Sequence, residues 1–235
     1  MTDTPVPMLT PHRRRGIEHL DAPATDDALR ERSLRDIRRA NTVLGGGWAV
    51  LREMARLLPS LGARATLLDV GTGLADIPAA VRRLAARSGV ELTAYGVDEA
   101  ASLVRVNHGQ LDGSVCADAR RLPFAKASVD VVTCSQVLHH FPDEEIPAVL
   151  QEMTRVARRA VIVSDLRRSW VAASGFWLAS WPLGFHAVTR HDGVVSVLRG
   201  FTPQELTTHV RAATGRTAAV RRHVGFRLTA TWVPA

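Results

Sequence analysis

The feature that most constrains this chain is a regular alternation of apolar runs and amphipathic stretches that begins near residue 65. The stretches between the runs have apolar residues at helical spacing. Strands that alternate with helices form a parallel sheet with helices on both faces, because each crossover returns over the sheet. We therefore predict an α/β protein, with strands at the runs ATLLDV, ELTAYGVD, GSVCAD, VDVVTCSQ and RAVIVSDL.

The C-terminal part breaks this alternation. A helix is predicted at 202–215, with Thr202 as its N-cap and Glu205 three residues later as the second half of a capping box. Two further strand candidates, TAAVRRHV and FRLTATWV, follow closely enough to pair antiparallel. We therefore expect a C-terminal antiparallel hairpin at one edge of the sheet.

The chain divides into three predicted parts. Residues 1–25 contain four prolines and no apolar periodicity, which is typical of an irregular arm. The apolar spacing in residues 26–60 predicts a cap of two helices, separated at Gly45–Gly47. Residues 61–235 form the main domain, and 169–200 is an insertion that we expect to cover the binding site.

Composition narrows the class of protein. The chain has a net charge of +7, and basic chains often bind nucleic acid or anionic membranes. Its arginines are scattered over predicted helix surfaces, apart from Arg13–Arg15 and the segment RERSLRDIRR, which favours a solvated face over an RNA-binding track. The first residues have no apolar signal-peptide core, which favours a cytoplasmic protein. We expect neither a disulfide scaffold nor a bound metal.

The turn after the first predicted strand, in LLDVGTGLADIP, indicates a ligand site. Gly71 and Gly73 allow the backbone to approach a ligand closely. A dinucleotide would require a third glycine where Asp76 stands, and this carboxylate would repel a pyrophosphate. S-adenosylmethionine (SAM) has no phosphate and carries a sulfonium cation, so carboxylates near the turn favour it.

Four motifs in order resemble the class I SAM-dependent methyltransferases, in particular the ubiquinone/menaquinone-type small-molecule methylases. The first motif matches at Asp69, Gly71 and Gly73, with Ala75 in place of its third glycine, and YGVDEA, CADARRLPF and VDVVTCSQVLHHF resemble the next three. The resemblance implies a Rossmann-like sheet of seven strands and SAM as the cofactor. It places cofactor contacts at Asp69, Gly71, Thr72, Gly73, Asp98, Glu99, Asp118, Ala119 and Ser135.

The resemblance also assigns roles to two carboxylates. Asp98 would bind both ribose hydroxyls, and Asp118 would accept a hydrogen bond from the adenine amino group beside the backbone of Ala119. Each acid could instead simply cap a turn or a helix. Three successive acids at carboxyl ends of strands favour a ligand site, because open α/β sheets bind ligands there.

Candidate catalytic residues follow the fourth and fifth predicted strands. His139 and His140 follow the fourth strand, and Asp165 ends the fifth. A histidine held by a carboxylate is a suitable general base near neutral pH. The alternative is that one histidine caps a helix and the other packs. His191, beside Asp192, is a second candidate, for which a plain turn is the favoured interpretation.

The segment 169–188 is rich in aromatic residues and has no charge. Gly175, Pro182 and Gly184 argue against a transmembrane helix. A lid over the acceptor pocket, including Trp170, Trp177 and Trp181, a homodimer contact, a surface that touches a membrane, and ordinary core packing all stay open.

These features predict a methyltransferase for a small, largely apolar hydroxylated acceptor such as a phenol, quinol or polyketide-type natural product, with oxygen favoured over carbon as the target. C-methylation of a quinone-type precursor is the first alternative. An RNA methyltransferase is the second; the chain has no appended RNA-binding module, so we expect no nucleic-acid partner. A non-catalytic cofactor-binding partner of another subunit is the third.

Overall fold

The computed structural model describes residues 9–14, 16, 18, 19, 29, 32, 33, 35–37, 39, 40, 45–107 and 109–234. Its centre is a seven-stranded sheet in the order β3-β2-β1-β4-β5-β7-β6. The strands are β1 (Arg64–Val70), β2 (Glu91–Asp98), β3 (Gly113–Cys116), β4 (Val129–Ser135), β5 (Ala157–Leu166), β6 (Ala219–His223) and β7 (Arg227–Trp232). The first five are parallel and β7 is antiparallel to both of its neighbours, which confirms the predicted fold class.

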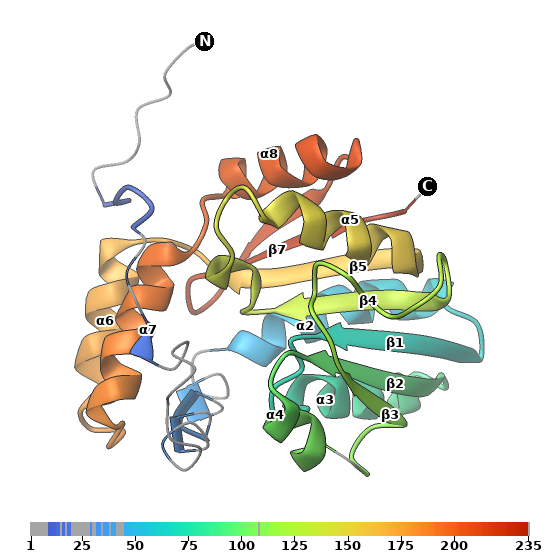
Figure 1. The fold of residues 1–235 in the computed structure, drawn as a ribbon, viewed down its shortest axis with the longest axis horizontal. Helices are drawn as coiled ribbons and strands as arrows, with labels where there is room; N and C mark the ends of the chain where they lie inside the picture. Colours follow the sequence, from blue (N-terminus) through green and yellow to red (C-terminus); the bar gives the residue numbers. More distant parts are fainter. Residues whose placement is uncertain are drawn as a thin grey trace.

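Helices cover both faces of this sheet and one end of it (Figure 1). They are α2 (Gly46–Leu57), α3 (Asp76–Arg87), α4 (Ala101–Val106), α5 (Ile146–Val156), α6 (Trp170–Ser180), α7 (Ala187–Arg199) and α8 (Pro203–Thr214), with short 3₁₀ turns η2 (Leu58–Ser60) and η3 (Leu138–His140). In Figure 1 the arrowheads of the parallel strands point toward α6 and α7, so this pair stands at the carboxyl edge of the sheet.

Side chains alternate between two apolar layers along the central strands. Leu67 packs with residues of α2 and α3, whereas its neighbour Leu68 packs with residues of α5 and α8. The same alternation separates Val131 from Val132 in β4. Successive residues of a strand point to opposite faces, so continuous apolar runs are expected wherever helices cover both faces.

The C-terminal elements follow the sequence closely. Thr202 Oγ1 accepts from the backbone N–H of Glu205, and the Glu205 carboxylate accepts from the N–H of Thr202, which confirms the predicted capping box of α8. β6 and β7 form the predicted antiparallel hairpin. The segment 169–200, which was predicted only as an insertion over the binding site, contains the two helices α6 and α7.

The predicted N-terminal cap contributes both to the core and to the wall of the cavity. α2 begins at Gly46, after Gly45 in a left-handed conformation, and packs Val50 and Met54 against the sheet, as part of the core rather than of a lid. Of the described residues before it, Glu18, Ile37 and Ala40 line the cavity described below. Residues 1–8, 15, 17, 20–28, 30, 31, 34, 38 and 41–44 of the predicted arm and cap lie outside the described residues.

Trp232 tests the two-layer core. Its side chain is 2% exposed, and its indole N–H donates to Thr154 Oγ1 at 3.0 Å. We expect Trp232→Ala to lower the free energy of unfolding by about 3–5 kcal/mol, because it removes a large buried side chain and leaves a cavity. Urea denaturation measures this loss. Trp48→Ala is the control, because Trp48 is 41% exposed, and its cost is expected to stay below about 1 kcal/mol. Equal losses would contradict this description of the core.

Candidate active site

The glycine turn after β1 is shaped by contacts with β2. The backbone N–H groups of Gly71 and Thr72 both donate to the carbonyl of Val97, at 2.8 and 3.0 Å. Gly71 has φ +71°, and a Cβ there would lie 2.2 Å from Val137 Cγ2. Gly73 has φ +54° with open space where its Cβ would stand. A side chain at position 71 would clash with Val137, whereas the absence of a side chain at position 73 leaves open space beside the backbone.

Ala75 takes the place of the third glycine of the motif. It has φ +57°, in the left-handed region that glycine adopts without strain, and its side chain is fully buried. A larger side chain at this N-cap of α3 would not fit. The structure thus retains a glycine-like backbone where the sequence has a small residue.

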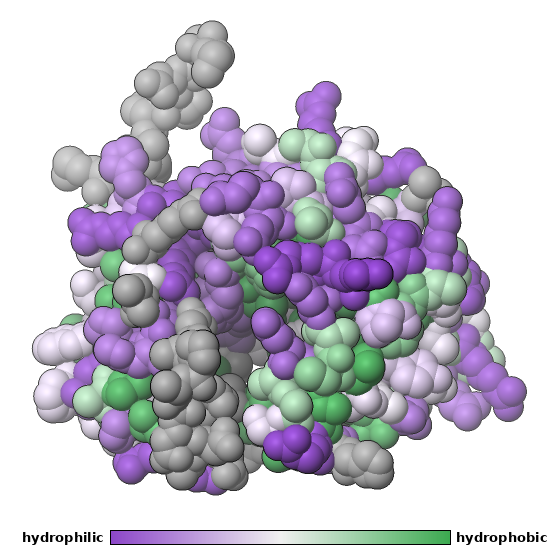
Figure 2. Space-filling model, in the orientation of Figure 1, coloured by the Kyte–Doolittle hydropathy of each residue, from purple (hydrophilic) through white to green (hydrophobic). Residues whose placement is uncertain are grey.

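A cavity of about 900 Å³ opens beside this turn, at the upper end of the range for small-molecule sites. Figure 2 shows the hollow near the centre of this face. Among the nine predicted cofactor contacts, Asp118 alone does not line the cavity; the lining ones are Asp69, Gly71, Thr72, Gly73, Asp98, Glu99, Ala119 and Ser135. One pocket therefore holds residues from the ends of β1, β2 and β4.

Asp69 is almost fully buried at the end of β1. Its Oδ1 accepts a hydrogen bond from Thr133 Oγ1 at 2.6 Å, across the β1–β4 pairing. Burial raises the pKa of Asp69 to about 7, against the lowering effect of the Thr133 hydroxyl. A cationic ligand beside this carboxylate would stabilise its ionised form.

Asp98 ties the glycine turn to the segment before α4. Its Oδ2 accepts from the N–H of Gly73 at 2.9 Å, and its Oδ1 accepts from the N–H of Ala100 at 3.0 Å. Burial raises the pKa of Asp98, although these backbone donors oppose the shift. The carboxylate lines the cavity, and its contact with the ribose stays a prediction.

Asp118 lies away from the cavity wall. Its carboxylate pairs with the Arg120 guanidinium at 2.6 Å, and this hydrogen-bonded pair lowers the pKa of Asp118. Arg120 pairs in turn with Glu145 at 2.7 Å and itself lines the cavity. The predicted adenine contact of Asp118 stays a prediction, and in this structure Ala117 and Ala119 present the wall at that point.

His139 and Asp165 form a buried pair. The Nδ1 atom of His139 lies 2.7 Å from Asp165 Oδ1, and the two side chains are 2% and 0% exposed. Burial opposes ionisation of Asp165, but His139 and the N–H of Leu166 outweigh it, so that the pKa of Asp165 is lowered. Nδ1 therefore donates a hydrogen bond to the ionised carboxylate, and in a neutral imidazole with this tautomer the lone pair lies on Nε2.

The Nε2 atom of His139 is buried and has no hydrogen-bond partner among the described residues. His139 also lines the cavity, whereas Asp165 stands behind it. A buried basic nitrogen without a partner is costly unless a ligand supplies one. The geometry thus offers a proton acceptor to a molecule in the cavity.

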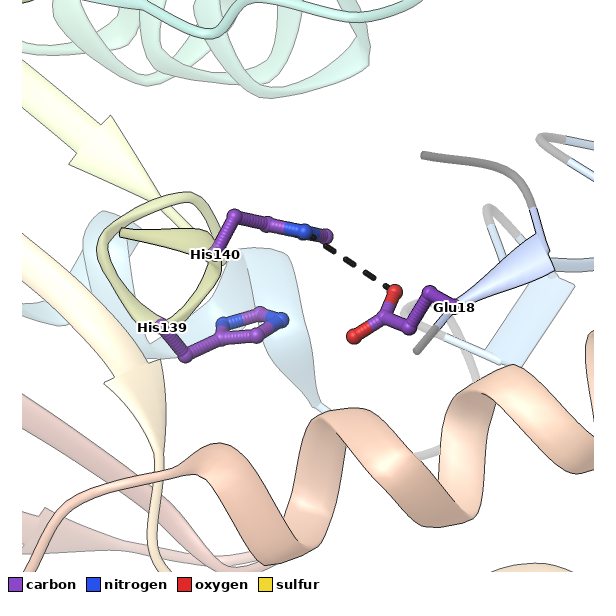
Figure 3. Close-up of side chains that lie close together, drawn as sticks. All are labelled: Glu18, His139 and His140. Atoms are coloured by element: carbon purple, nitrogen blue, oxygen red, sulfur yellow. Dashed lines mark ion pairs between the residues drawn. The ribbon is translucent and has the colours of Figure 1, made fainter. Parts of the chain in front are cut away.

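Glu18 reaches the same point from the N-terminal segment. Figure 3 shows both imidazoles of His139 and His140 facing its carboxylate, and His140 Nδ1 lies 3.8 Å from Glu18 Oε2. Glu18 Oε1 accepts from Ser196 Oγ and from Arg199 Nη1, each at 2.9 Å. The carboxylate is thereby held over the cavity with its charge compensated.

The ligand atoms of Glu18, His139 and His140 lie within 4.8 Å of one another, a spacing that can hold a metal ion. Two features make this donor set a poor cation site. Arg199 already neutralises Glu18, and the His139 ring is held by Asp165 with one nitrogen directed at the cavity. The arrangement suits a hydroxyl group, which can donate to one of these groups and accept from another.

His191 is not brought to the cavity. It lies in α7 with half of its side chain exposed, and its Nδ1 is 2.9 Å from Asp192 Oδ1, so these chain neighbours do face each other. The ring also contacts His19 at 4.6 Å between centroids. The predicted turn is a helix, and Asp192, not His191, lines the cavity.

Several residues of the cavity wall were not predicted from the sequence. Glu18 lies in a segment without periodicity, so no local signal could identify it. Arg227 is buried at the start of β7, where burial lowers its pKa to about 10 and Asp165 opposes the shift. Its Nη1 donates to Gln136 Oε1 at 2.8 Å. The antiparallel direction of β7 brings this residue beside the carboxyl end of β5, and that pairing was the available signal.

The residues present fit SAM. The open space beside Gly73 admits close backbone approach, and the buried Ser135 Oγ, on the cavity wall, has no hydrogen-bond partner among the described residues. The carboxylates of Asp69 and Asp98 provide negative charge and acceptors for a cationic, hydroxylated ligand. No pyrophosphate would be stable beside Asp69, Asp76 and Asp98.

Comparisons with known proteins agree with this geometry. Residues 68–163 match the methyltransferase domain family model. The fold is similar to magnesium protoporphyrin IX methyltransferase from Synechocystis PCC 6803, crystallised with SAM (TM-score 0.54, 14% identity, 93% of this chain and 89% of that one). It is also similar to a SAM-dependent methyltransferase from Aquifex aeolicus (TM-score 0.59, 15% identity, 86% and 98%).

One curated relative is the biotin biosynthesis bifunctional protein BioHC of Cellvibrio japonicus, 33% identical over 141 residues. The match covers 55% of this chain and only 27% of the length of that protein. The fold is that of SAM-dependent methyltransferases, and residues 68–163 carry a methyltransferase domain. It is a transferase domain, and its cofactor is SAM.

The pKa of Asp69 makes cofactor binding depend on pH. The pKa of Asp69 is about 7 in the folded protein, against 3.8 for a free carboxyl, so the folded apoprotein keeps a proton that the unfolded chain releases. The stability that this group contributes is therefore fully present at low pH and is lost as the pH rises through about 7. The sulfonium favours the ionised form. We therefore expect SAM affinity, measured by calorimetry, to rise as the pH passes through about 7.

Asp69→Asn is the matched test of this dependence, because it keeps the shape and removes the titration. The variant is expected to flatten the pH profile of SAM affinity. S-adenosylhomocysteine (SAH), which lacks the sulfonium charge, should show a weaker profile with the unaltered protein. An unchanged profile in Asp69→Asn would assign the titration to another group.

Proposed function

We propose that this protein transfers the methyl group of SAM to a hydroxyl oxygen of a small, largely apolar acceptor, of the phenol, quinol or polyketide type. The observation that carries this proposal is His139, which lines the cavity: its Nδ1 is held at 2.7 Å by the buried Asp165, and its Nε2 has no hydrogen-bond partner among the described residues. When bound, SAM supplies an electrophilic methyl group, so the protein need only orient and deprotonate the acceptor.

The acceptor side of the cavity is built for such a molecule. Phe176 of α6 and Val197 of α7 provide apolar wall, and Glu18 and His140 provide polar contacts at one point. An apolar wall with few convergent polar groups is the usual form of a small-molecule site. These features support a greasy acceptor that carries a hydroxyl group.

The proton path follows from the His139–Asp165 pair. The acceptor O–H would donate to Nε2 of His139, and this nitrogen would take the proton as the acceptor oxygen gains the methyl group, whose bond to the sulfur of SAM breaks to leave SAH. Asp165 Oδ1 keeps its hydrogen bond to Nδ1–H and stabilises the imidazolium that forms. Glu18, Phe176 of α6 and Val197 of α7 line this side of the cavity and would limit the access of water to the base.

The resemblance to ubiquinone/menaquinone-type methylases supports the same acceptor class, and C-methylation of a quinone-type precursor is the alternative outcome. The same base would serve either, and NMR of the methylated product distinguishes a methoxy from a carbon-bound methyl group. The Haloferax volcanii protein that is crystallised with the methyltransferase activator Trm112 resembles this chain in fold (TM-score 0.60, 14% identity), and a likeness at this identity shows the fold alone.

The catalytic assignment is tested at His139. We expect His139→Ala to lower kcat by about 10²–10⁴-fold, the usual contribution of a general base, while SAH affinity stays near that of the unaltered protein. Asp165→Asn should lower kcat less and shift the pH profile of kcat. His191→Ala should retain activity, because His191 is not part of the cavity wall. Equal activity of His139→Ala and the unaltered protein would remove the assignment.

A further test concerns the cluster of Glu18, His139 and His140. Because Arg199 compensates Glu18 and Asp165 holds His139, we expect methyl transfer to continue after dialysis against EDTA, with kcat changed by less than about twofold. Loss of activity on chelation, restored by one divalent metal, would reassign the cluster as a metal centre.

No helix in the described part of the chain is long and apolar enough to cross a membrane. The cytoplasmic location and the homodimer expected from the sequence stay predictions.

A further inference from the structure

Helix α6 is apolar on every side, yet it lies at the edge of the molecule. Its inner side, with Ala172, Ala173 and Ser180, is buried. Its outer side carries large apolar residues that solvent reaches: Trp170 (37% exposed), Val171 (49%), Trp177 (46%), Leu178 (62%) and, at the C-cap, Trp181 (56%). We call these five residues the α6 outer face. Half of the ten large hydrophobic residues that are exposed in the described chain belong to it.

The α6 outer face is continuous along the helix. Trp170, Trp177 and Trp181 are spaced by seven and four residues, so they follow one side of an α-helix for about 16 Å. Leu9, itself 58% exposed, adjoins it, because its carbonyl accepts from the backbone N–H of Trp170 at 3.0 Å. No residue of 169–188 is charged. An apolar patch of this kind on a protein surface indicates a binding face.

Basic side chains stand at both ends of this face. The Arg14 guanidinium lies over the Trp170 ring at 4.9 Å from the centroid, and that of Arg190 lies over Trp181 at 3.6 Å. Tryptophan prefers the boundary between hydrocarbon and headgroups, and arginine is attracted to anionic headgroups. The chain as a whole has a net charge of +7. Figure 2 shows pale and green residues at the left edge, over α6, among hydrophilic ones.

The same helix also forms part of the acceptor cavity. Phe176 lines it, next to Trp177 of the outer face, and α7, packed against α6, adds Gly193, Ser196 and Val197. A surface that touches α6 from outside is therefore separated from the acceptor cavity by the thickness of one helix.

We propose that the α6 outer face binds the surface of an anionic lipid bilayer, with its apolar side chains among the headgroups and Arg14 and Arg190 on the lipid phosphates, so that an apolar acceptor passes from the bilayer to the cavity. The binding face stands on its own observations, and the passage of the acceptor rests on the proposed function. The helix lies in the plane of the interface and does not span the membrane, as expected for a short helix without the length to cross it.

The test is flotation of the full-length protein with vesicles of phosphatidylglycerol mixed with phosphatidylcholine, compared with pure phosphatidylcholine. The unaltered protein should float with the anionic vesicles and less with the neutral ones, and added salt should weaken its binding. Trp177→Ser combined with Leu178→Ser should lower vesicle affinity by about tenfold or more, since binding scales with buried apolar area. Trp48→Ser is the matched control, because Trp48 is equally exposed and also stacks with an arginine, Arg52, on α2.

Folding and catalysis are measured without vesicles, so a failure of the membrane-binding proposal can be distinguished from a failure of the proposed methyl transfer. The double variant should keep SAH binding by thermal shift and turnover of a water-soluble phenol, while losing vesicle binding. Failure of the unaltered protein to float, or equal loss in Trp48→Ser, would overturn the membrane proposal and leave methyl transfer untouched. A dimer in light scattering that the double variant abolishes, without vesicle binding, would assign the face to a second copy of the chain and overturn it as well.

Discussion

Burial of the central strands on both faces is the constraint on which the rest of this structure depends. Helices cover each side of β1, β4 and β5, so a polar side chain inside these strands would lose its hydration unless it found a partner. The groups that can do chemistry are therefore concentrated where the parallel strands end. Asp69, Asp98 and Asp165 all stand at such ends, and the carboxyl edge gathers them around one cavity.

Two of these carboxylates show how environment divides one residue type into two roles. Asp69 and Asp165 are both buried at strand ends. Asp69 has a neutral hydroxyl partner, so burial dominates and raises its pKa to about 7. Asp165 faces His139 and an N–H group, which lower its pKa. This difference supports the proposal that the first carboxylate meets a cationic ligand and the second orients a base.

The two sides of the cavity come from different parts of the chain. The cofactor side is made by strand ends and the glycine turn, which the sheet holds rigidly. The acceptor side is made by Glu18, Phe176 and Ser196, from an N-terminal segment and an inserted helix pair. A fixed scaffold with a separate cover is how one fold serves different acceptors, so the acceptor has to be argued from the cover and not from the fold.

The sequence by itself determined the order of strands and helices, the glycine turn, the capping box of α8 and the strand ends at which His139 and Asp165 stand, because periodicity and turn chemistry act between near neighbours. Only the tertiary structure decided that His191 lies outside the cavity and that the helices of 169–200 stand at the carboxyl edge of the sheet. It alone brought Glu18 to Ser196, 178 residues away. Contacts at such separations follow from how whole elements pack, and no local pattern records them.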